Sequence, residues 1–268
     1  MRIIINPRYA YLRDYLEHID EHFDREGHEI HRDRNVIRTL QVEGLTLCVK
    51  RYGRVSLPAR VATKLRVRTS RARKAYVSPL LLKERGFESP EPVAFVRYNR
   101  GLIDSVSYFV CLHSSYRYSM ADIMTLDEEK RREVTEAFAK YAADLHTDGF
   151  LHRDFSADNI LFDFIDDALS SRIHFSLIDT NSMRCGRSVG LKQGCANFAR
   201  LTGDENFFRH LAECYAHARN ADAEECAELI LKAHRDYLQR TQNGSRTAAE
   251  GYDKARHHAQ KLMAGFAI

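Results

Sequence analysis

The sequence predicts an α+β protein in two parts, with a mainly β part first and a mainly α part after it. Segments up to about residue 113 are short, rich in β-branched and aromatic residues, and separated by turn signals. Beyond residue 125, apolar side chains recur at helical spacing over long stretches. Strands that come first and helices that come later favour an α+β arrangement.

The composition is that of an ordinary globular protein. The chain has 268 residues, 41 basic and 37 acidic side chains and a net charge of +4, with 44% apolar residues. These values argue against a disordered or fibrous chain, and the length allows one large domain or two lobes. No apolar run approaches the roughly 18 residues of a membrane span, and the N-terminus lacks the apolar stretch of a signal peptide. The six cysteines form no C-x-x-C pair, which suits a reducing cytoplasm and disfavours structural zinc and disulfides.

In the first part we expect a small antiparallel sheet interrupted by one helix. A hairpin is predicted where two apolar segments flank Glu43 and Gly44. The expected strands are 30–40, 45–52, 93–98 and 105–113, with a turn at Arg100 and Gly101 before the last one. The helix is expected over about 70–85, with a break or restart at Pro79, because proline lacks an N–H and clashes with the preceding turn.

In the second part a long helix is expected to begin near Thr125, where Thr125 and Glu128 fit a capping box. Gly149 is placed to end this helix. Two short strands should follow, over 159–164 and 172–178. Residues 191–240 read as helical with breaks at Gly203 and Asn220, and a last helix is expected over 247–264.

One motif carries chemistry, and it lies between the long helix and the strand pair. Residues 152–159 read His-Arg-Asp-Phe-Ser-Ala-Asp-Asn and match H-R-D-x-x-x-x-N, the catalytic loop of protein-kinase-like enzymes. The second strand of the pair ends at Asp179, where the metal-binding aspartate of such enzymes should lie, and Lys50 closes a strand upstream. Order and spacing therefore predict a two-lobed, protein-kinase-like fold. We expect a small, mainly β N-lobe over 1–113, a larger, mainly α C-lobe over 114–268, and ATP between them.

Phosphoryl transfer needs positioning and charge neutralisation more than covalent chemistry, which suggests a role for each residue. Asp154 would accept or orient the proton of the acceptor hydroxyl. Asn159 and Asp179 would hold Mg²⁺ through hard oxygen ligands. Lys50 would contact the phosphates of ATP as a point charge. In the same loop, His152 is expected to brace the backbone.

Several segments resemble the lipopolysaccharide core kinases, the family of Kdo kinases and heptose kinases. Residues 152–161 look like that family's catalytic loop, and residues 177–183 are similar to its metal-binding segment, in which D-x-N-R-M replaces D-F-G. Residues 49–52 resemble its lysine strand, and residues 70–76 and 84–92 its helix and the entry to the next strand. The resemblance covers most of residues 1–185, and the C-terminal third carries no matching motif.

The resemblance implies an ATP-dependent kinase with a divalent metal that phosphorylates a sugar hydroxyl, on Kdo or a heptose, in the inner core of lipopolysaccharide. Such an enzyme works in the cytoplasm, and peripheral contact with the inner membrane would bring it to its lipid-linked acceptor. Seven of the fifteen residues from Arg60 to Lys74 are basic. They could meet anionic headgroups or the acidic groups of the core, or form a solvated surface. Nucleic acid is not expected as a partner, since no RNA-binding motif occurs, and no signal for an oligomeric state is present.

Three departures from the family pattern stand out. The glycine-rich phosphate loop is missing, and the resemblance assigns Arg34 to phosphate contact in its place. Val77 stands where the helix should carry the glutamate that pairs with the lysine. Ser182 replaces an expected arginine, with Arg184 close by, and Arg153 is expected to pair with a carboxylate or stabilise the loop.

Two other functions stay open. A pseudokinase that acts as a scaffold or binding module fits the missing glutamate at Val77, but retention of Lys50, Asp154, Asn159 and Asp179 opposes it. A protein Ser/Thr/Tyr kinase is the weaker alternative, because no A-P-E segment follows Asp179.

Overall fold

The computed structural model describes residues 1–33, 35–52, 71–100, 104–166 and 171–243. Four expectations fall outside these residues: Arg34, residues 60–70 of the basic stretch, the turn at Gly101 and the helix over 247–264. The described chain forms two compact units. One holds Met1–Ser115 with Thr180–Ser182, and the other holds Tyr116–Asp179 with the residues from Met183 onward.

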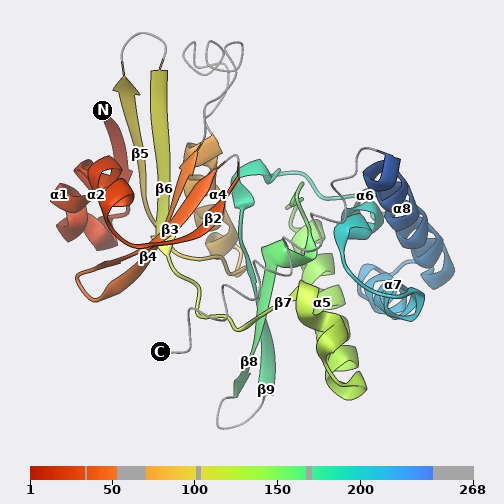
Figure 1. Cartoon of the computed structure of the whole chain (residues 1–268). Helices are drawn as coiled ribbons and strands as arrows, with labels where there is room; N and C mark the ends of the chain where they lie inside the picture. The colour runs from red at the N-terminus through yellow and green to blue at the C-terminus, as the bar shows by residue number, and fades with distance from the viewer. Residues whose placement is uncertain (34, 53–70, 101–103, 167–170, 244–268) are drawn as a thin grey trace. The chain divides into compact units, whose positions relative to one another are not determined.

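The first unit is built on a six-stranded antiparallel sheet with the order β1-β5-β6-β4-β3-β2 (Figure 1). Its strands are β1 (Arg2–Ile5), β2 (His28–Arg32), β3 (Val36–Val42), β4 (Leu45–Tyr52), β5 (Pro92–Arg100) and β6 (Asp104–Leu112). Its helical segments are η1 (Pro7–Leu12), α1 (Arg13–Glu17), α2 (Ile19–Arg25) and α4 (Arg71–Glu84). The stretch expected to be one strand over 30–40 is two strands, β2 and β3.

Alternation along β4 divides its side chains between two cores. Leu47 and Val49 are buried in a cluster with Leu16 and Phe23 from the N-terminal helices. Tyr52, on the opposite face, packs in a second cluster with residues of α4. Because successive side chains of a strand point to opposite faces, Lys50 shares the α4 face with Tyr52.

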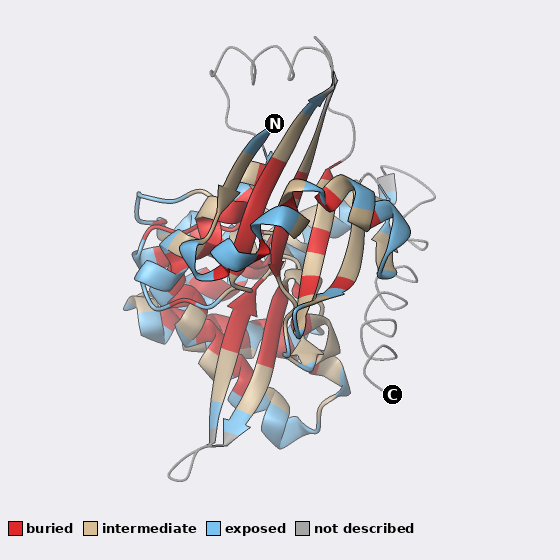
Figure 2. Cartoon of the chain, turned by 90° about the vertical axis from the view of Figure 1, so that its left-hand side faces the viewer, coloured by how far each residue is buried: buried red, intermediate tan, exposed pale blue. Residues whose placement is uncertain are grey.

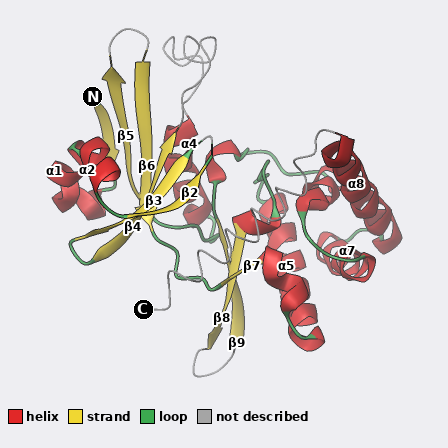
Figure 3. Cartoon of the chain, viewed as in Figure 1, coloured by secondary structure: helices red, strands yellow, loops and turns green. Residues whose placement is uncertain are grey.

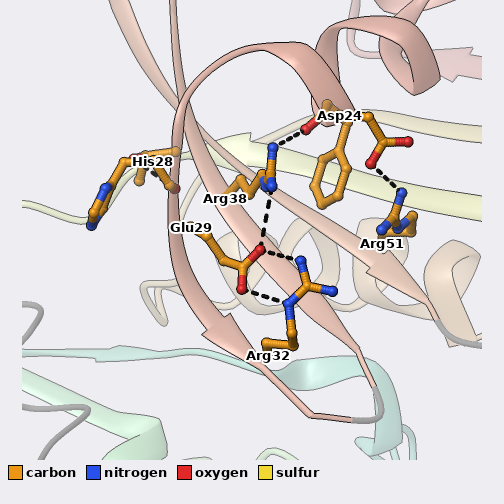
Figure 4. Close-up of polar contacts among 8 residues, drawn as sticks. Asp24, His28, Glu29, Arg32, Arg38 and Arg51 are labelled. Atoms are coloured by element: carbon orange, nitrogen blue, oxygen red, sulfur yellow. Dashed lines mark hydrogen bonds and ion pairs between the residues drawn. The ribbon is translucent and has the colours of Figure 1, made fainter.

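The N-terminal helices α1 and α2 cover one face of the sheet, which the sequence analysis did not foresee. The hydroxyl of Tyr98 on β5 donates to the Glu17 carbonyl at 2.6 Å. Arg38 on β3 donates to the Phe23 carbonyl at 2.7 Å, and Arg51 on β4 pairs with Asp24 at 2.6 Å (Figure 4). These contacts fasten α1 to β5, and α2 to β3 and β4.

Helix α4 runs unbroken from Arg71 to Glu84 with Pro79 inside it, so the predicted break at Ser78 and Pro79 is wrong. The proline removes one backbone N–H from the helical ladder. The helix nevertheless continues, because Tyr76 before the proline and Leu82 after it are both buried. Tertiary packing on both sides thus outweighs the local preference. In the same unit, α4 packs against η4 (Thr180–Ser182).

The second unit combines a three-stranded sheet with helices (Figure 3). Its strands are β7 (Tyr118–Ser119), β8 (Ile160–Asp166) and β9 (Ser171–Leu177). Its helical segments are η2 (Met120–Thr125), α5 (Glu128–Thr147), η3 (Ala157–Asn159), α6 (Leu191–Asn197), η5 (Phe198–Arg200), α7 (Glu205–Arg219) and α8 (Ala223–Asn243). Helix α7 ends at Asn220 in the left-handed region, with φ 50°, and residues 201–204 separate η5 from α7, so both predicted breaks are confirmed.

Helix α5 is capped by Asp127 and not by Thr125. The carboxylate of Asp127 accepts from the Lys130 N–H at 2.9 Å, whereas the hydroxyl of Thr125, the last residue of η2, donates back to the Asp122 carbonyl. The predicted capping box was wrong because Asp127 lies closer to the start of the helix and binds one of its orphan donors. At the other end Gly149 has φ 85°, as a helix-ending glycine should.

Aromatic rings form the core of the second unit. Phe138 of α5 contacts the rings of Phe155, Phe175 and Phe198, which belong to the loop after α5, to β9 and to η5. Buried residues lie along the strands and on the inner sides of the helices (Figure 2). Within the described ranges, every helix falls short of the length or the apolar composition that crossing a membrane requires.

Candidate active site

His152 joins the motif loop to the strand that leads to Asp179. Its imidazole is fully buried. Nε2 donates to the Ile178 carbonyl at 3.0 Å, and Nδ1 accepts from the Asp154 N–H at 3.2 Å. Burial lowers the pKa of His152, so the ring is neutral and its two nitrogens have fixed roles. His152 therefore connects the backbone at Asp154 in the motif loop to the backbone at Ile178, the residue before Asp179.

Asn159 and Asp179 are brought together by the register of the β8–β9 hairpin. Ile160 pairs with Leu177, so the hairpin ends with Asn159 beside Ile178, and the Ile178 N–H donates to the Asn159 carbonyl at 3.0 Å. The side-chain Nδ2 of Asn159 donates to the Asp154 carbonyl at 2.9 Å. Local pairing along one hairpin thus places Asp154 and Asn159 of the motif at the same hairpin end as Asp179.

Asp179 adopts a left-handed backbone conformation, with φ 53°. This region is uncommon for a residue other than glycine, and such residues concentrate at functional sites. Asp179 lies two residues after the end of β9 and directly before η4.

The donor set at this end of the hairpin fits a hard divalent cation. With its Nδ2 bonded to the Asp154 backbone, Asn159 has only its carbonyl oxygen left as a ligand. The half-exposed carboxylate of Asp179 can supply further oxygens. Among the described residues no group of three or more His, Cys, Asp and Glu side chains could hold a metal. A cation here would therefore complete its shell with phosphate oxygens and water.

Arg200 is the functional candidate that the sequence analysis missed. Its guanidinium forms an ion pair with the carboxylate of Asp154 and lies 5.7 Å from the centre of the Tyr237 ring. Both charged side chains are partly exposed, at 41% and 36%. Arg200 follows the motif by 46 positions and has no fixed spacing from it in any pattern we know, so only the fold reveals the contact.

The other expected residues are placed as follows. Arg153, expected to pair with a carboxylate or to stabilise the loop, is exposed, and the arginine that pairs with Asp154 is Arg200. Arg184 exchanges two backbone hydrogen bonds of 2.9 Å with Leu151, which ties the segment after Asp179 to the start of the motif loop. Lys50 belongs to the first unit, on the α4 face of β4, and its Nζ lies 5.6 Å from the centre of the Tyr52 ring.

Comparisons with known proteins identify the relatives of this chain. Residues 80–207 match the model of the lipopolysaccharide kinase (Kdo/WaaP) family. A solved structure of WaaP in complex with acyl carrier protein superposes with a TM-score of 0.61 and 17% sequence identity, covering 89% of this chain and 99% of that one. This likeness shows a kinase-like α+β fold. No curated protein matches the sequence.

Two further structures are more distant. The Rio2 kinase from Chaetomium thermophilum, in an ADP/Mg²⁺-phosphoaspartate complex, has a TM-score of 0.43 and 17% identity, covering 93% of this chain and 76% of that one. WbdD has a TM-score of 0.45 and 15% identity, covering 86% and 50%. The family match spans the motif loop, the β8–β9 hairpin and Asp179. The chain therefore resembles the lipopolysaccharide kinase (Kdo/WaaP) family over residues 80–207, and it is an ATP-dependent phosphotransferase that acts on a sugar hydroxyl.

Proposed function

We propose that this protein transfers the γ-phosphate of ATP to a hydroxyl of Kdo or of a heptose in the inner core of lipopolysaccharide. Residues 1–113 would bind ATP, with Lys50 on its phosphates and Arg34 as a further phosphate contact. Residues 114–268 would carry the catalytic loop, the metal ligands and the acceptor site. The acceptor is linked to lipid, so the enzyme would work at the cytoplasmic face of the inner membrane, in peripheral contact with it.

One observation carries this proposal: at one end of the β8–β9 hairpin the Asn159 side chain donates to the Asp154 carbonyl, and the Asn159 carbonyl accepts from Ile178, the residue before Asp179. Phosphoryl transfer is accelerated chiefly by positioning and by neutralising charge, and this arrangement supplies groups for both. A scaffold would need none of the three in this arrangement.

In the proposed mechanism Asp154 receives the acceptor hydroxyl. Its carboxylate orients that hydroxyl toward the phosphate and takes up its proton, which contributes roughly 10²–10⁴-fold to the rate. Asn159 and Asp179 would hold Mg²⁺, which when bound neutralises charge on the phosphates. His152 keeps the backbone of Asp154 fixed relative to the strand end that presents Asp179.

Nucleotide binding is tested by thermal shift. Mg-ATP should raise the Tm of the wild type, and Asp179→Ala should abolish that shift, because the metal links the carboxylate to the nucleotide. As a matched control, Asp163→Ala removes an aspartate of the same hairpin that pairs with Arg117, and it should keep the shift. A wild type that shows no shift with Mg-ATP would favour the scaffold.

The acceptor is tested by offering four substrates with labelled ATP: Kdo-lipid A, the same glycolipid extended by heptose, lipid A without Kdo, and a generic protein. Label on the first acceptor assigns Kdo, and label on the second alone assigns heptose. Label on the protein alone would overturn the proposed sugar acceptor. Mass spectrometry of core glycolipid from a deletion strain should show the loss of one phosphate.

A further inference from the structure

A run of polar side chains connects α7 to the motif loop; His146 and Tyr215 in it are buried, and Asn197 and Arg219 are half-buried. Arg219 donates to the Tyr215 hydroxyl at 3.0 Å, and that hydroxyl lies 2.8 Å from Nδ1 of His146 on α5. Nε2 of His146 lies 3.1 Å from Oδ1 of Asn197, the last residue of α6. Nδ2 of Asn197 donates to the His152 carbonyl at 2.9 Å. Four side chains from three helices thus end on the backbone of the loop.

These groups lie where an unpaired polar atom would be costly. His146 and Tyr215 are fully buried, and the ring of Phe198 contacts both of them. Burial together with the positive charges of Arg219 and Arg184 lowers the pKa of His146 to about 4. The imidazole is therefore neutral near pH 7, with one nitrogen as donor and the other as acceptor.

Only one arrangement of protons satisfies the whole run. A guanidinium can only donate, so the Tyr215 oxygen accepts from Arg219 and turns its own proton toward His146. Nδ1 of His146 then accepts, and Nε2 carries the proton that reaches Asn197 Oδ1. This fixes the amide of Asn197 so that its NH₂ group faces the His152 carbonyl. Each bond thereby sets the direction of the next.

The run ends at Asn197, which binds the carbonyl of His152, and His152 in turn binds the Asp154 N–H. His152 accepts from the Asp154 N–H and donates to the Ile178 carbonyl, while its own carbonyl is held by Asn197. We propose that Asn197, His146, Tyr215 and Arg219 form a positioning relay that fixes the loop backbone and thereby the direction of the Asp154 carboxylate. This inference rests on the proposed function, in which Asp154 receives the acceptor hydroxyl.

A glycine in α6 supports the assignment independently. Gly194 is buried inside the helix, with its N–H bonded to the Gly190 carbonyl at 2.9 Å. A Cβ at position 194 would overlap the Tyr215 hydroxyl and lie 3.0 Å from Nδ1 of His146. Glycine weakens a helix relative to alanine. Glycine at position 194 therefore costs helix stability, but it leaves the space that the hydrogen bond between His146 and Tyr215 occupies.

The relay is tested with two variants and a matched control. Asn197→Asp keeps the size of the side chain but replaces the donor that faces the His152 carbonyl with an acceptor. Gly194→Ala forces apart the bond between His146 and Tyr215. Gly190→Ala lies at the start of the same helix, where a Cβ meets nothing within 4 Å, and serves as the control.

We expect kcat to fall roughly 10- to 100-fold in the first two variants, because small misplacements of a catalytic group cost that much. The KM for ATP should stay within about twofold of the wild type, and Gly190→Ala should behave as wild type. Imidazole ¹⁵N spectra add a readout that does not depend on turnover. His146 should show the Nε2–H tautomer in the wild type and lose that preference in Tyr215→Phe, which removes only one oxygen.

Three results would overturn the relay: wild-type kcat in folded Asn197→Asp and Gly194→Ala, an Nδ1–H tautomer of His146 in the wild type, or equal losses in kcat and in ATP binding. Should either of those variants fail to fold, the kcat and the spectrum of Tyr215→Phe decide. Asp154→Ala separates this inference from the proposed function. If Asp154→Ala keeps turnover, the proposed function fails. If it loses turnover while the relay variants keep theirs, the relay alone fails.

Discussion

The carboxylate of Asp154 is tied to Arg200, which also lies over the ring of Tyr237. A guanidinium pairs with a carboxylate through a planar fork of donors, so it fixes the direction of the group as well as its charge environment. Arg200 belongs to η5, three residues after Asn197, and the carbonyl of Ala199 lies 3.0 Å from Nδ1 of His234 on α8. The Asp154 carboxylate is therefore oriented by Arg200, whose helical turn η5 is held against α8 by the contact between Ala199 and His234.

Replacing Arg200 by glutamine should lower kcat about tenfold, because Asp154 then samples orientations that do not face the acceptor. Arg200→Lys should recover part of the loss, since lysine restores the charge but not the planar fork. ADP release in a coupled assay gives kcat, and the KM for ATP should stay unchanged in both variants. Wild-type kcat in Arg200→Gln would show that the ion pair has no part in the reaction.

His146 makes the stability of the protein depend on pH. Its pKa is about 4 in the folded chain, below the ordinary value of 6.5. As the pH falls through this window, the unfolded chain binds a proton that the folded chain does not, so the free energy of unfolding decreases. Well above pH 6.5 the stability no longer depends on this group, because His146 is neutral in both the folded and the unfolded chain. A difference of about 2.5 pKa units corresponds to a loss on the order of 3 kcal/mol by pH 4.

The test is urea unfolding of the wild type and His146→Gln at pH 7 and pH 5. The variant should be less stable at pH 7 and should lose less stability on acidification, because it has no imidazole to protonate. His152, whose pKa is also lowered by burial, is present in both proteins and does not affect the comparison. Equal losses on acidification would contradict a neutral, buried His146.

At the scale of elements, α2 is attached to the sheet by arginines that lie against Phe23. Arg38 and Arg51 lie 5.4 and 4.6 Å from the centre of the Phe23 ring. Arg38 also pairs with Glu29, which Arg32 contacts from the other side (Figure 4). The hydrogen bond from Arg32 lowers the pKa of Glu29 to about 2. Of the two arginines that contact Glu29, Arg38 has the half-buried side chain, and it also donates to the Phe23 carbonyl of α2.

Arg38→Ala should lower the free energy of unfolding by about 2 kcal/mol, because it leaves the Phe23 carbonyl without its donor and uncovers the ring. Arg32→Ala is the matched control, since its side chain is 58% exposed and surface ion pairs contribute little. Denaturant unfolding of both variants measures the difference. Equal destabilisation would mean that the contact with Glu29, and not the one with α2, matters.

Two elements show why local patterns mislead. Pro79 predicts a break, but buried neighbours on both sides keep α4 continuous. Thr125 and Glu128 match a capping box, but Asp127 lies nearer the first turn and caps α5. Both breaks, at Gly203 and Asn220, were predicted correctly, and Asn220 occupies a left-handed backbone position that few residues tolerate. The signal of Asn220, set by its own backbone, was thus more dependable than signals that compete with packing.

At the scale of the whole molecule, the family resemblance and the motif loop could be predicted because their residues are close together in the sequence. His152 to Asn159 is one short segment, and Asp179 follows it across one hairpin. The contacts of Arg200 and the relay from Arg219 could not be predicted, since tertiary packing of α5, α6 and α7 brings those residues to the loop. The N-terminal helices α1 and α2 were missed because they have only five and seven residues, which is too short for a repeating apolar pattern to show in the sequence.

The central claim is that Asp154 serves phosphate transfer to a core sugar. It is tested most directly by measuring transfer of labelled phosphate from ATP to Kdo-lipid A, with and without the added heptose, by the wild type and by Asp154→Asn. The wild type should label one acceptor, and Asp154→Asn should keep its Mg-ATP thermal shift while transfer falls at least about 100-fold. Transfer at the wild-type rate by a folded, nucleotide-binding Asp154→Asn variant would contradict the claim.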